Sequence, residues 1–158
     1  MEQETCPHTD MQLSENGVWF IKTNEGFKPK VYNDNGKPAI GYGHDLQEGE
    51  SFPDGITEPQ AETVLLKDAA LLYPVIARFL PQATQNQFDA LVDFGYNLGI
   101  EDLEKLLRHG PAALPAQMPL WCYERNAQGV EVKNPVLAAR RAAEVAMLSE
   151  KQPVNSGQ

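Results

Sequence analysis

The chain has 158 residues and a formal net charge of −9 at pH 7. This length is in the range of one domain, which can bury a core of its own without disulfides or metals. The acidic balance argues against nucleic acid as a partner, because binding to phosphates needs clustered Lys and Arg side chains. No apolar run approaches the length of a membrane-spanning helix, so we expect no membrane insertion.

The N-terminal residues MEQETCPHTDMQ begin with acidic side chains and lack the apolar core of a signal peptide. We therefore expect synthesis in the cytoplasm, and export by another system if the protein acts outside. Cys6 and Cys122 lack metal-ligand spacing and are too few for a disulfide framework, which favours a reducing compartment. One bond between these two cysteines stays open.

The first expected helix covers residues 13–24, where apolar residues recur at roughly helical spacing and Ser14 can cap the start. The helix should end near Glu25, because Gly26 suits the left-handed C-cap position. Pro29 prevents the helix from restarting, so the chain must change direction there.

Strands are expected at 30–34 and 37–42, on either side of Asn35-Gly36. An Asn-Gly pair between β-favouring residues is the strongest short signal for a two-residue hairpin turn. The segment 45–55 is acidic and rich in Gly and Pro, which is typical of a loop.

Two capping boxes predict long helices, one at Thr57 with Gln60 and one at Thr84 with Gln87. Each box precedes apolar residues at helical spacing, which we expect to face the core. The remaining expected helices cover 101–108, 112–123 and, after Asn134-Pro135, the residues up to about 149.

The order of one helix, one hairpin and then helices only predicts an α+β fold. We expect a small β-hairpin lobe, about 25–57, packed against a mainly helical lobe with a cleft between them. The domain should cover 13–149, with polar tails at 1–12 and 150–158. The cleft between the lobes is the natural binding site.

Glu25 and Asp34 are the candidate catalytic pair, because glycosidic cleavage usually needs one protonated and one ionised carboxyl group. The negative end of the helix dipole and partial burial should both raise the pKa of Glu25, as a general acid requires. Asp34 lies beside the hairpin turn, where backbone donors and water should keep it ionised.

Each member of this pair also has a purely structural explanation. A Glu at a helix end is commonly a solvated surface residue, and an Asp before Asn-Gly is commonly a turn former. With a two-residue turn, Asp34 faces Lys37 across the hairpin, and the two could simply form a surface ion pair.

The stretch ENGVWFIKTNEGFKPKVYNDNGKPAIGYGH resembles the start of the phage-type lysozymes and endolysins, glycoside hydrolase family 24. The resemblance rests on Glu25-Gly26 at a helix end, on Asp34 nine residues on, and on a strand that ends in Gly-x-Gly-His at Gly41 to His44. Further along, ITEPQAETVLLKD, QFDALVDFGYNLG and AARRAAEVAML resemble, in order, the family's connecting helix, core helix and final Arg-Arg helix.

The resemblance implies that Glu25 is the general acid and that Asp34 holds or activates a water that attacks from the opposite face of the sugar ring. We therefore expect inversion, for which the two carboxyl groups stand about 6.5 to 9.5 Å apart. The implied substrate is the β-1,4 bond between N-acetylmuramic acid and N-acetylglucosamine in the glycan strands of bacterial peptidoglycan.

The sequence departs from the family pattern in the hairpin. The segment between Asp34 and Ile40 is one residue shorter, and Ala39 stands where the family has a threonine that helps to hold the water. Alternation along the strands places Asp34, Lys37, Tyr32 and Ala39 on one face. Ala39 should therefore border the water site of Asp34, and the missing hydroxyl should slow the reaction rather than abolish it.

The resemblance also implies supporting residues. His44 is expected to pair with Asp68 on the connecting helix, and Tyr96 and Asn97 are expected to line the saccharide cleft, although an aromatic residue at helical spacing is commonly a core residue. Arg140 or Arg141 should contact Glu25 through a charge-assisted hydrogen bond, and the other arginine should form a surface ion pair. We expect no metal and no cofactor.

Three readings of the function remain open at this point. The first is a monomeric lysozyme that acts on the bacterial cell wall after release or export. The second is a peptidoglycan-binding protein with impaired catalysis, which Ala39 and the shortened turn would explain. The third is an antibacterial effector delivered into another cell, or a virion component, with the same chemistry.

Overall fold

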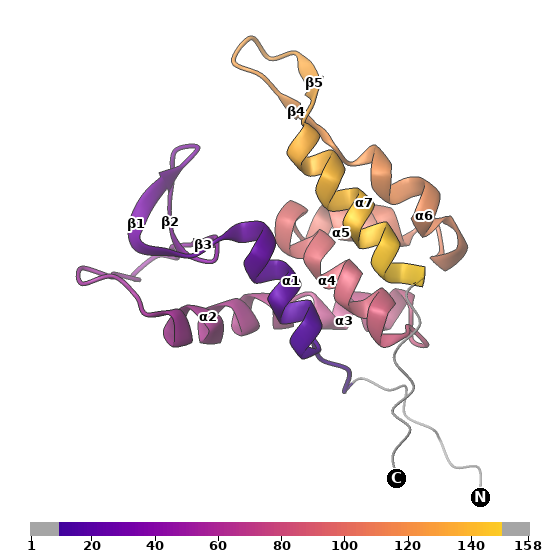
Figure 1. Ribbon diagram of the computed structural model, residues 1–158, viewed down its shortest axis with the longest axis horizontal. Helices are drawn as coiled ribbons and strands as arrows, with labels where there is room; N and C mark the ends of the chain where they lie inside the picture. The colour runs from indigo at the N-terminus through magenta and orange to yellow at the C-terminus, as the bar shows by residue number, and fades with distance from the viewer. Residues whose placement is uncertain (1–9, 150–158) are drawn as a thin grey trace, which may run out of the picture.

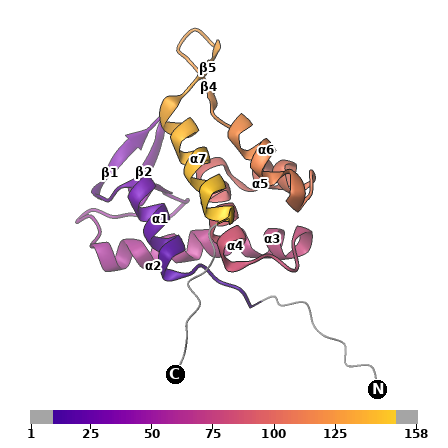
Figure 2. The same ribbon diagram turned by 45° about the vertical axis from the view of Figure 1, so that its right-hand side comes forward.

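The computed structural model describes residues 10–149, so Cys6 and most of the two expected tails lie outside the described residues. Within this range the fold is α+β, as the order of elements predicts. A small three-stranded sheet lies beside a larger helical lobe, and both views show the two lobes joined by α1 and α2 (Figure 1, Figure 2).

The small lobe follows α1 (Glu15–Glu25), whose N-terminus is capped by the hydroxyl of Ser14. Its antiparallel strands are β1 (Lys28–Asp34), β2 (Lys37–Gly41) and β3 (His44–Asp45), in that order across the sheet. Asn35 and Gly36 form the turn between β1 and β2 with φ of 51° and 93°, the conformation that Asn-Gly predicts. The sequence does not predict β3, which is only two residues long.

Two capped helices connect and fill the helical lobe. Both capping boxes form, at the start of α2 (Glu58–Ala70) and at the start of α4 (Gln85–Leu98). α2 contacts β2 and β3 of the sheet as well as α3 and α4. α4 is the central helix, because nine of its residues are buried and it packs against α1, α5 and α7.

The other helices are α3 (Tyr73–Phe79), α5 (Ile100–Leu107), η1 (Pro111–Ala113), α6 (Leu114–Gln117), η2 (Met118–Leu120) and α7 (Pro135–Ser149). The prediction of one helix over 112–123 is wrong, since three short turns occupy 111–120. Each turn has a proline at its first or second position, at Pro111, Pro115 and Pro119. Proline has no N–H and clashes with the preceding turn, so it starts helices and interrupts them.

The prediction of helices only after the first hairpin is also wrong. A second hairpin, β4 (Tyr123–Arg125) and β5 (Glu131–Lys133), projects from the helical lobe directly before α7 (Figure 1). All residues of both strands are exposed. Each strand has only three residues, and neither has a buried face. The hairpin therefore leaves no alternation of apolar and polar residues in the sequence from which it could be predicted.

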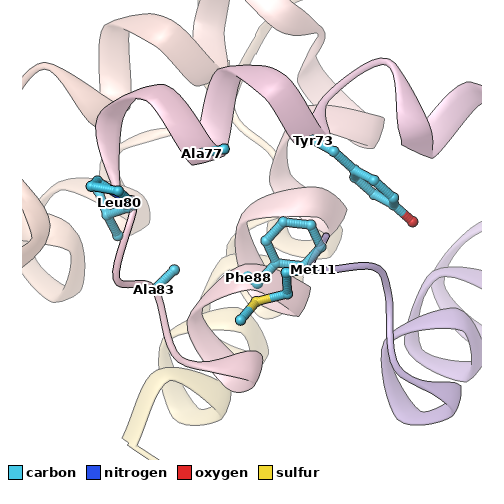
Figure 3. Close-up of a pocket in the computed structure, with 7 residues that line it drawn as sticks. Met11, Tyr73, Ala77, Leu80, Ala83 and Phe88 are labelled. Carbon is cyan, nitrogen blue, oxygen red and sulfur yellow. The ribbon is translucent and has the colours of Figure 1, made fainter. Parts of the chain in front are cut away.

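The packed part of the chain begins ahead of Leu13. Met11, Tyr73 and Phe88 line the same small pocket between α3 and α4 (Figure 3). The backbone N–H of Leu13 donates to the Tyr73 hydroxyl oxygen at 3.1 Å. The segment before α1 is therefore held by the core rather than trailing from it.

Cys122 is buried and has no disulfide partner among the described residues. Its pairing with Cys6 lies outside the described residues. None of the helices within 10–149 combines the length and the apolar character needed to cross a membrane.

Candidate active site

The Glu25 carboxylate lies where the two lobes meet. Glu25 is the last residue of α1, and Gly26 ends the helix with φ of 72° while its N–H donates to the Lys22 carbonyl oxygen at 2.9 Å. The Glu25 side chain is 20% exposed. It is therefore half-buried and still accessible to a ligand.

Arg140 is the arginine that contacts Glu25. Its Nη1 lies 2.8 Å from Glu25 Oε1. The same guanidinium donates to both oxygens of Asp93 on α4, through Nε at 2.9 Å and Nη2 at 2.8 Å. Since α7 packs along α4, a bidentate pair between these helices fixes the direction in which Arg140 points.

Arg141 is not the surface ion-pair former that the sequence suggests. It is fully buried, and its Nη2 donates to Asn97 Oδ1 at 2.7 Å and to Glu144 Oε1 at 2.9 Å. Its guanidinium carbon lies 4.8 Å from the centre of the Phe94 ring. The buried residues of α7 are Arg140, Arg141, Glu144 and Met147, so the two adjacent arginines share one wide buried face of the helix.

The pKa of Glu25 is raised above its ordinary value. Burial raises it most, Arg140 lowers it, and the negative charges of Asp93 and Asp34 raise it further. The direction agrees with the sequence-based expectation. Burial is the main cause of the raised pKa, and the positive charge of Arg140 partly opposes it.

Asp34 ends β1 in an exposed position, and its Oδ1 accepts a hydrogen bond from Asn35 Nδ2 at 3.2 Å. The register pairs Asp34 with Lys37 and Tyr32 with Ala39, as a two-residue turn predicts. No ion pair joins Asp34 to Lys37 within residues 10–149, which leaves the Asp34 carboxylate without a cationic partner there. Its charge acts on Glu25 and Tyr32.

Ala39 is completely buried in β2. Its neighbour across the hairpin, Tyr32, is half-buried and feels the charges of Asp34, Glu25 and Asp45, which with burial raise the pKa of its hydroxyl. The sequence did not single out Tyr32 as a site residue. The structure places its hydroxyl among the same carboxylates that make up the candidate site.

An open groove runs between the lobes. It is lined by Gly43, His44, Asp45 and Gln47 from the small lobe, by Asp68, Leu71 and Leu72 at the end of α2, and by Gly95, Tyr96, Gly99 and Ile100. The Tyr96 hydroxyl donates to the Tyr42 carbonyl oxygen at 2.6 Å. This bond joins the two lobes at the groove that Tyr96 lines.

His44 forms the expected hydrogen bond with Asp68, from Nδ1 to Oδ2 at 2.6 Å. Its other nitrogen, Nε2, lies 3.0 Å from Glu50 Oε1. Burial lowers the pKa of His44, but the hydrogen bonds to Asp68 and Glu50 together raise it above its ordinary value. The sequence missed Glu50, which lies in a loop without a helical or strand pattern.

The comparison with protein families decides the identity. Residues 22–144 match the model of the family described as phage lysozyme, which spans Glu25, Asp34 and both arginines of α7. The chain belongs to the phage lysozyme family. The fold and the family that the sequence predicts are thereby confirmed.

Relatives of this phage lysozyme family member include the endolysin of Bacillus phage PZA, which is 36% identical over 155 residues, or 92% of this chain. The match covers 58% of that endolysin, so the chain spans little more than half of its length. The solved endolysin of Escherichia coli O157:H7 phage FAHEc1 is 31% identical with a TM-score of 0.79, over 89% of this chain and 95% of that one. The muramidase domain of SpmX from Asticaccaulis excentricus is 28% identical with a TM-score of 0.77, over 89% and 99% of the two chains.

Proposed function

We propose that this phage lysozyme family member hydrolyses the β-1,4 bond between N-acetylmuramic acid and N-acetylglucosamine in peptidoglycan, with Glu25 as the general acid. The observation that carries the proposal is the half-buried Glu25 carboxyl group with its raised pKa, held at 2.8 Å by Arg140 beside an open groove. A raised pKa extends the pH range in which the carboxyl is protonated and can donate its proton to the leaving glycosidic oxygen.

Asp34 is the proposed second carboxylate. It is exposed, it lies on the neighbouring strand, and its charge reaches Glu25. In this role it holds or activates the water that attacks the anomeric carbon, while Glu25 protonates the leaving oxygen on the other face, which gives inversion. Tyr96 lines the groove, and its neighbour in the chain, Asn97, accepts a hydrogen bond from Arg141; the position of Tyr96 supports a role in placing the saccharide, and Asn97 is proposed to share it.

Supporting roles follow from the contacts of the groove walls. His44 and Asp68 tie β3 to α2, so they hold the wall opposite Tyr96 in place. Arg140 orients Glu25, and Arg141 orients Asn97. We propose that the protein acts as a monomer on the bacterial cell wall, which it reaches through release or export by another system.

The test is the release of reducing ends from purified peptidoglycan by the wild type, Glu25→Gln and Asp34→Asn. We expect wild-type activity to fall as the pH rises through the raised pKa of Glu25, because the acid is then ionised. Glu25→Gln should lose nearly all activity at every pH. Wild-type protein that binds peptidoglycan and releases no reducing ends would refute the proposal.

The endolysin and muramidase relatives do not favour the alternative of a wall-binding protein without catalysis. Its one argument is Ala39, a buried residue without a hydroxyl in the hairpin that also carries Asp34. The same assay separates the two candidates, because a binder would be retained on insoluble peptidoglycan and release no product.

A further inference from the structure

Behind Glu25 lies a buried cluster of four ionisable side chains, Arg140, Asp93, Glu144 and Arg141. Asp93, Glu144 and Arg141 are completely buried, and Arg140 is 7% exposed. Arg140 joins Asp93 to Glu25, Arg141 lies 2.9 Å from Glu144, and Glu144 is within hydrogen-bonding reach of Asp93. The cluster is therefore one continuous chain of contacts from the cleft to the centre of the α4–α7 interface.

The charges of this chain do not balance if every acid is ionised. It contains two arginines and, with Glu25, three carboxyl groups. An unmatched charge in a buried position is costly, and a buried acid normally responds by keeping its proton. The balance therefore requires at least one of the three carboxyl groups to be protonated at neutral pH.

The contacts point to Glu144 as the group that keeps this proton. Its Oε1 accepts from Arg141, while its buried Oε2 has no hydrogen-bond donor among the described residues. The side chain of Glu144 is nevertheless within hydrogen-bonding reach of Asp93, and two carboxyl groups can share a hydrogen bond only if one is protonated. Burial, then this hydrogen bond, raises the pKa of Glu144 well above its ordinary value.

Asp93 is the better placed of the two for a negative charge. Both of its oxygens accept from Arg140, in the paired geometry that suits an ionised carboxylate. Arg140 and Arg141 face it as cations from α7, with Glu144 beside them, and Glu25 faces it from α1. A proton on Asp93 would remove one of its two bonds to Arg140.

We propose that Asp93 is a positioning residue that controls the protonation of Glu25 through Arg140, and that Glu144 holds the resident proton of the cluster so that Asp93 stays ionised. The inference rests on the proposed role of Glu25 as the acid. Asp93 takes up much of the positive charge of Arg140, so the guanidinium can aim the Glu25 carboxyl without forcing it to ionise. Without that counter-charge, Arg140 would hold Glu25 as an anion, which has no proton to donate.

Other groups also act on Glu25 and must be kept constant in a test. Asp34 and Tyr32 face it from β1, and Tyr96 faces it from α4. None of these residues contacts Asp93 or Glu144 through a hydrogen bond or ion pair that the described part of the chain shows. Substitutions at Asp93 and Glu144 therefore leave this second set of groups in place.

The direct test is the titration of the Glu side-chain carboxyl carbons by NMR in the wild-type protein. Glu144 should keep the chemical shift of a protonated carboxyl at pH 7. A signal of ionised Glu144 at that pH would overturn the proposal without any variant having to fold. This measurement reads the cluster even if the protein does not cleave peptidoglycan, so it fails separately from the proposed function.

The variants are Asp93→Asn, Glu144→Gln and the double variant, with Asp102→Asn as a control in an exposed pair with Lys105. The double variant should lower the pKa of Glu25 by about one unit, since an unopposed arginine lowers a neighbouring carboxyl pKa by that order. Asp93→Asn should give a smaller shift, because Glu144 can ionise in its place. Glu144→Gln and the control should leave the pKa of Glu25 where it is.

The pH profile of activity supplies a second readout. In the double variant the loss of activity at high pH should begin about one unit lower than in the wild type, in step with the pKa of Glu25. A double variant that is folded, as judged by its amide spectrum, and has an unshifted Glu25 pKa would overturn the role of Asp93. A Glu144→Gln protein in which the pKa of Glu25 is lowered as far as in the double variant would also overturn the role of Asp93.

Discussion

Gly43 and Glu25 touch across the cleft: a Cβ at Gly43 would stand 2.9 Å from Oε2 of Glu25, closer than real Cβ atoms come. Gly43 also has φ of 78°, a conformation that favours glycine. The Gly-x-Gly-His sequence thus brings the backbone of the small lobe against the candidate acid and leaves no room for a side chain between them.

We expect Gly43→Ala to reduce activity at least tenfold, because the methyl group must displace the Glu25 carboxyl and misplacement by about 1 Å can cost a hundredfold. Gly49→Ala is the matched control, since Gly49 has φ of 85° and nothing within 4 Å of its Cβ position. Both variants should lose about 1–2 kcal/mol of unfolding free energy from the left-handed backbone. Reducing-end release and urea unfolding of both proteins separate the shared strain from the effect on Glu25. Equal activity in the two variants would contradict the prediction.

Arg140→Ala should destabilise the protein by about 3–5 kcal/mol, because it leaves Asp93 buried without its cation. It should also raise the pKa of Glu25, since Arg140 lowers it in the wild type. The control is Arg108→Ala, an exposed arginine 3.8 Å from Glu104, where the change should stay within about 0.5 kcal/mol. Urea unfolding of the Arg140 and Arg108 variants at pH 7 measures the two changes in stability. A loss at Arg140 as small as that at Arg108 would mean that the contacts with Asp93 and Glu25 contribute little.

Ala39→Thr and Ala39→Val test the missing hydroxyl in the hairpin. The two side chains have similar shapes, and each adds atoms at a completely buried position, so each should cost about 1–3 kcal/mol of stability. If a hydroxyl at this position helps to hold the water of Asp34, the Thr variant should release reducing ends faster than the Val variant. Equal rates in the two proteins would exclude a contribution of the hydroxyl.

The pairing of His44 with Asp68 and Glu50 predicts a pH dependence of stability. The pKa of His44 is raised in the folded protein above its ordinary value of 6.5. The stabilisation is therefore fully present below about pH 6.5 and is lost as the pH rises through the folded-state pKa. Unfolding free energy, measured from pH 6 to 9, should fall in the wild type and stay level over this range in His44→Gln. A parallel fall in both proteins would assign the effect to another group.

Glu50 acts in the opposite direction at lower pH. Its pKa is lowered, first by the Gln47 backbone N–H and then by His44, so its contribution is present above its ordinary pKa of 4.5 and is lost as the pH falls through the folded-state value. The stabilisation from the contacts of His44 with Asp68 and Glu50 should accordingly be strongest between about pH 4.5 and 6.5. Glu50→Gln should weaken the dependence on pH on both sides of that window.

Local signals account for the parts of the fold that the sequence predicts. The caps at Ser14, Thr57 and Thr84 and the Asn35-Gly36 turn depend on hydrogen bonds and φ values within four residues, so their effect is visible in the sequence itself. The family resemblance then placed Glu25 and Asp34 together, which spacing alone does not do.

The contacts behind the site depend on packing between distant segments, and the sequence does not show them. Nothing near Arg141 in the chain indicates that the buried face of α7 is wide enough to include both arginines, so the burial of Arg141 was not predicted. One signal was available at Asp93, an acid within the apolar run of α4, at a position where a charge must find a distant cation. Glu144 offers no such sign, because an acid three residues after an arginine also suits an exposed helix.

The candidate acid lies at the end of α1, and the arginine that orients it lies in α7, the last helix of the described chain. Synthesis makes α1 first and α7 last among the described helices. Until the ribosome has released Arg140 in the first half of α7, Glu25 has neither its guanidinium partner nor the burial that α7 provides. A growing chain should therefore be unable to attack glycan, and so should any fragment cut ahead of residue 135. The activity becomes available only when nearly the whole domain has been made.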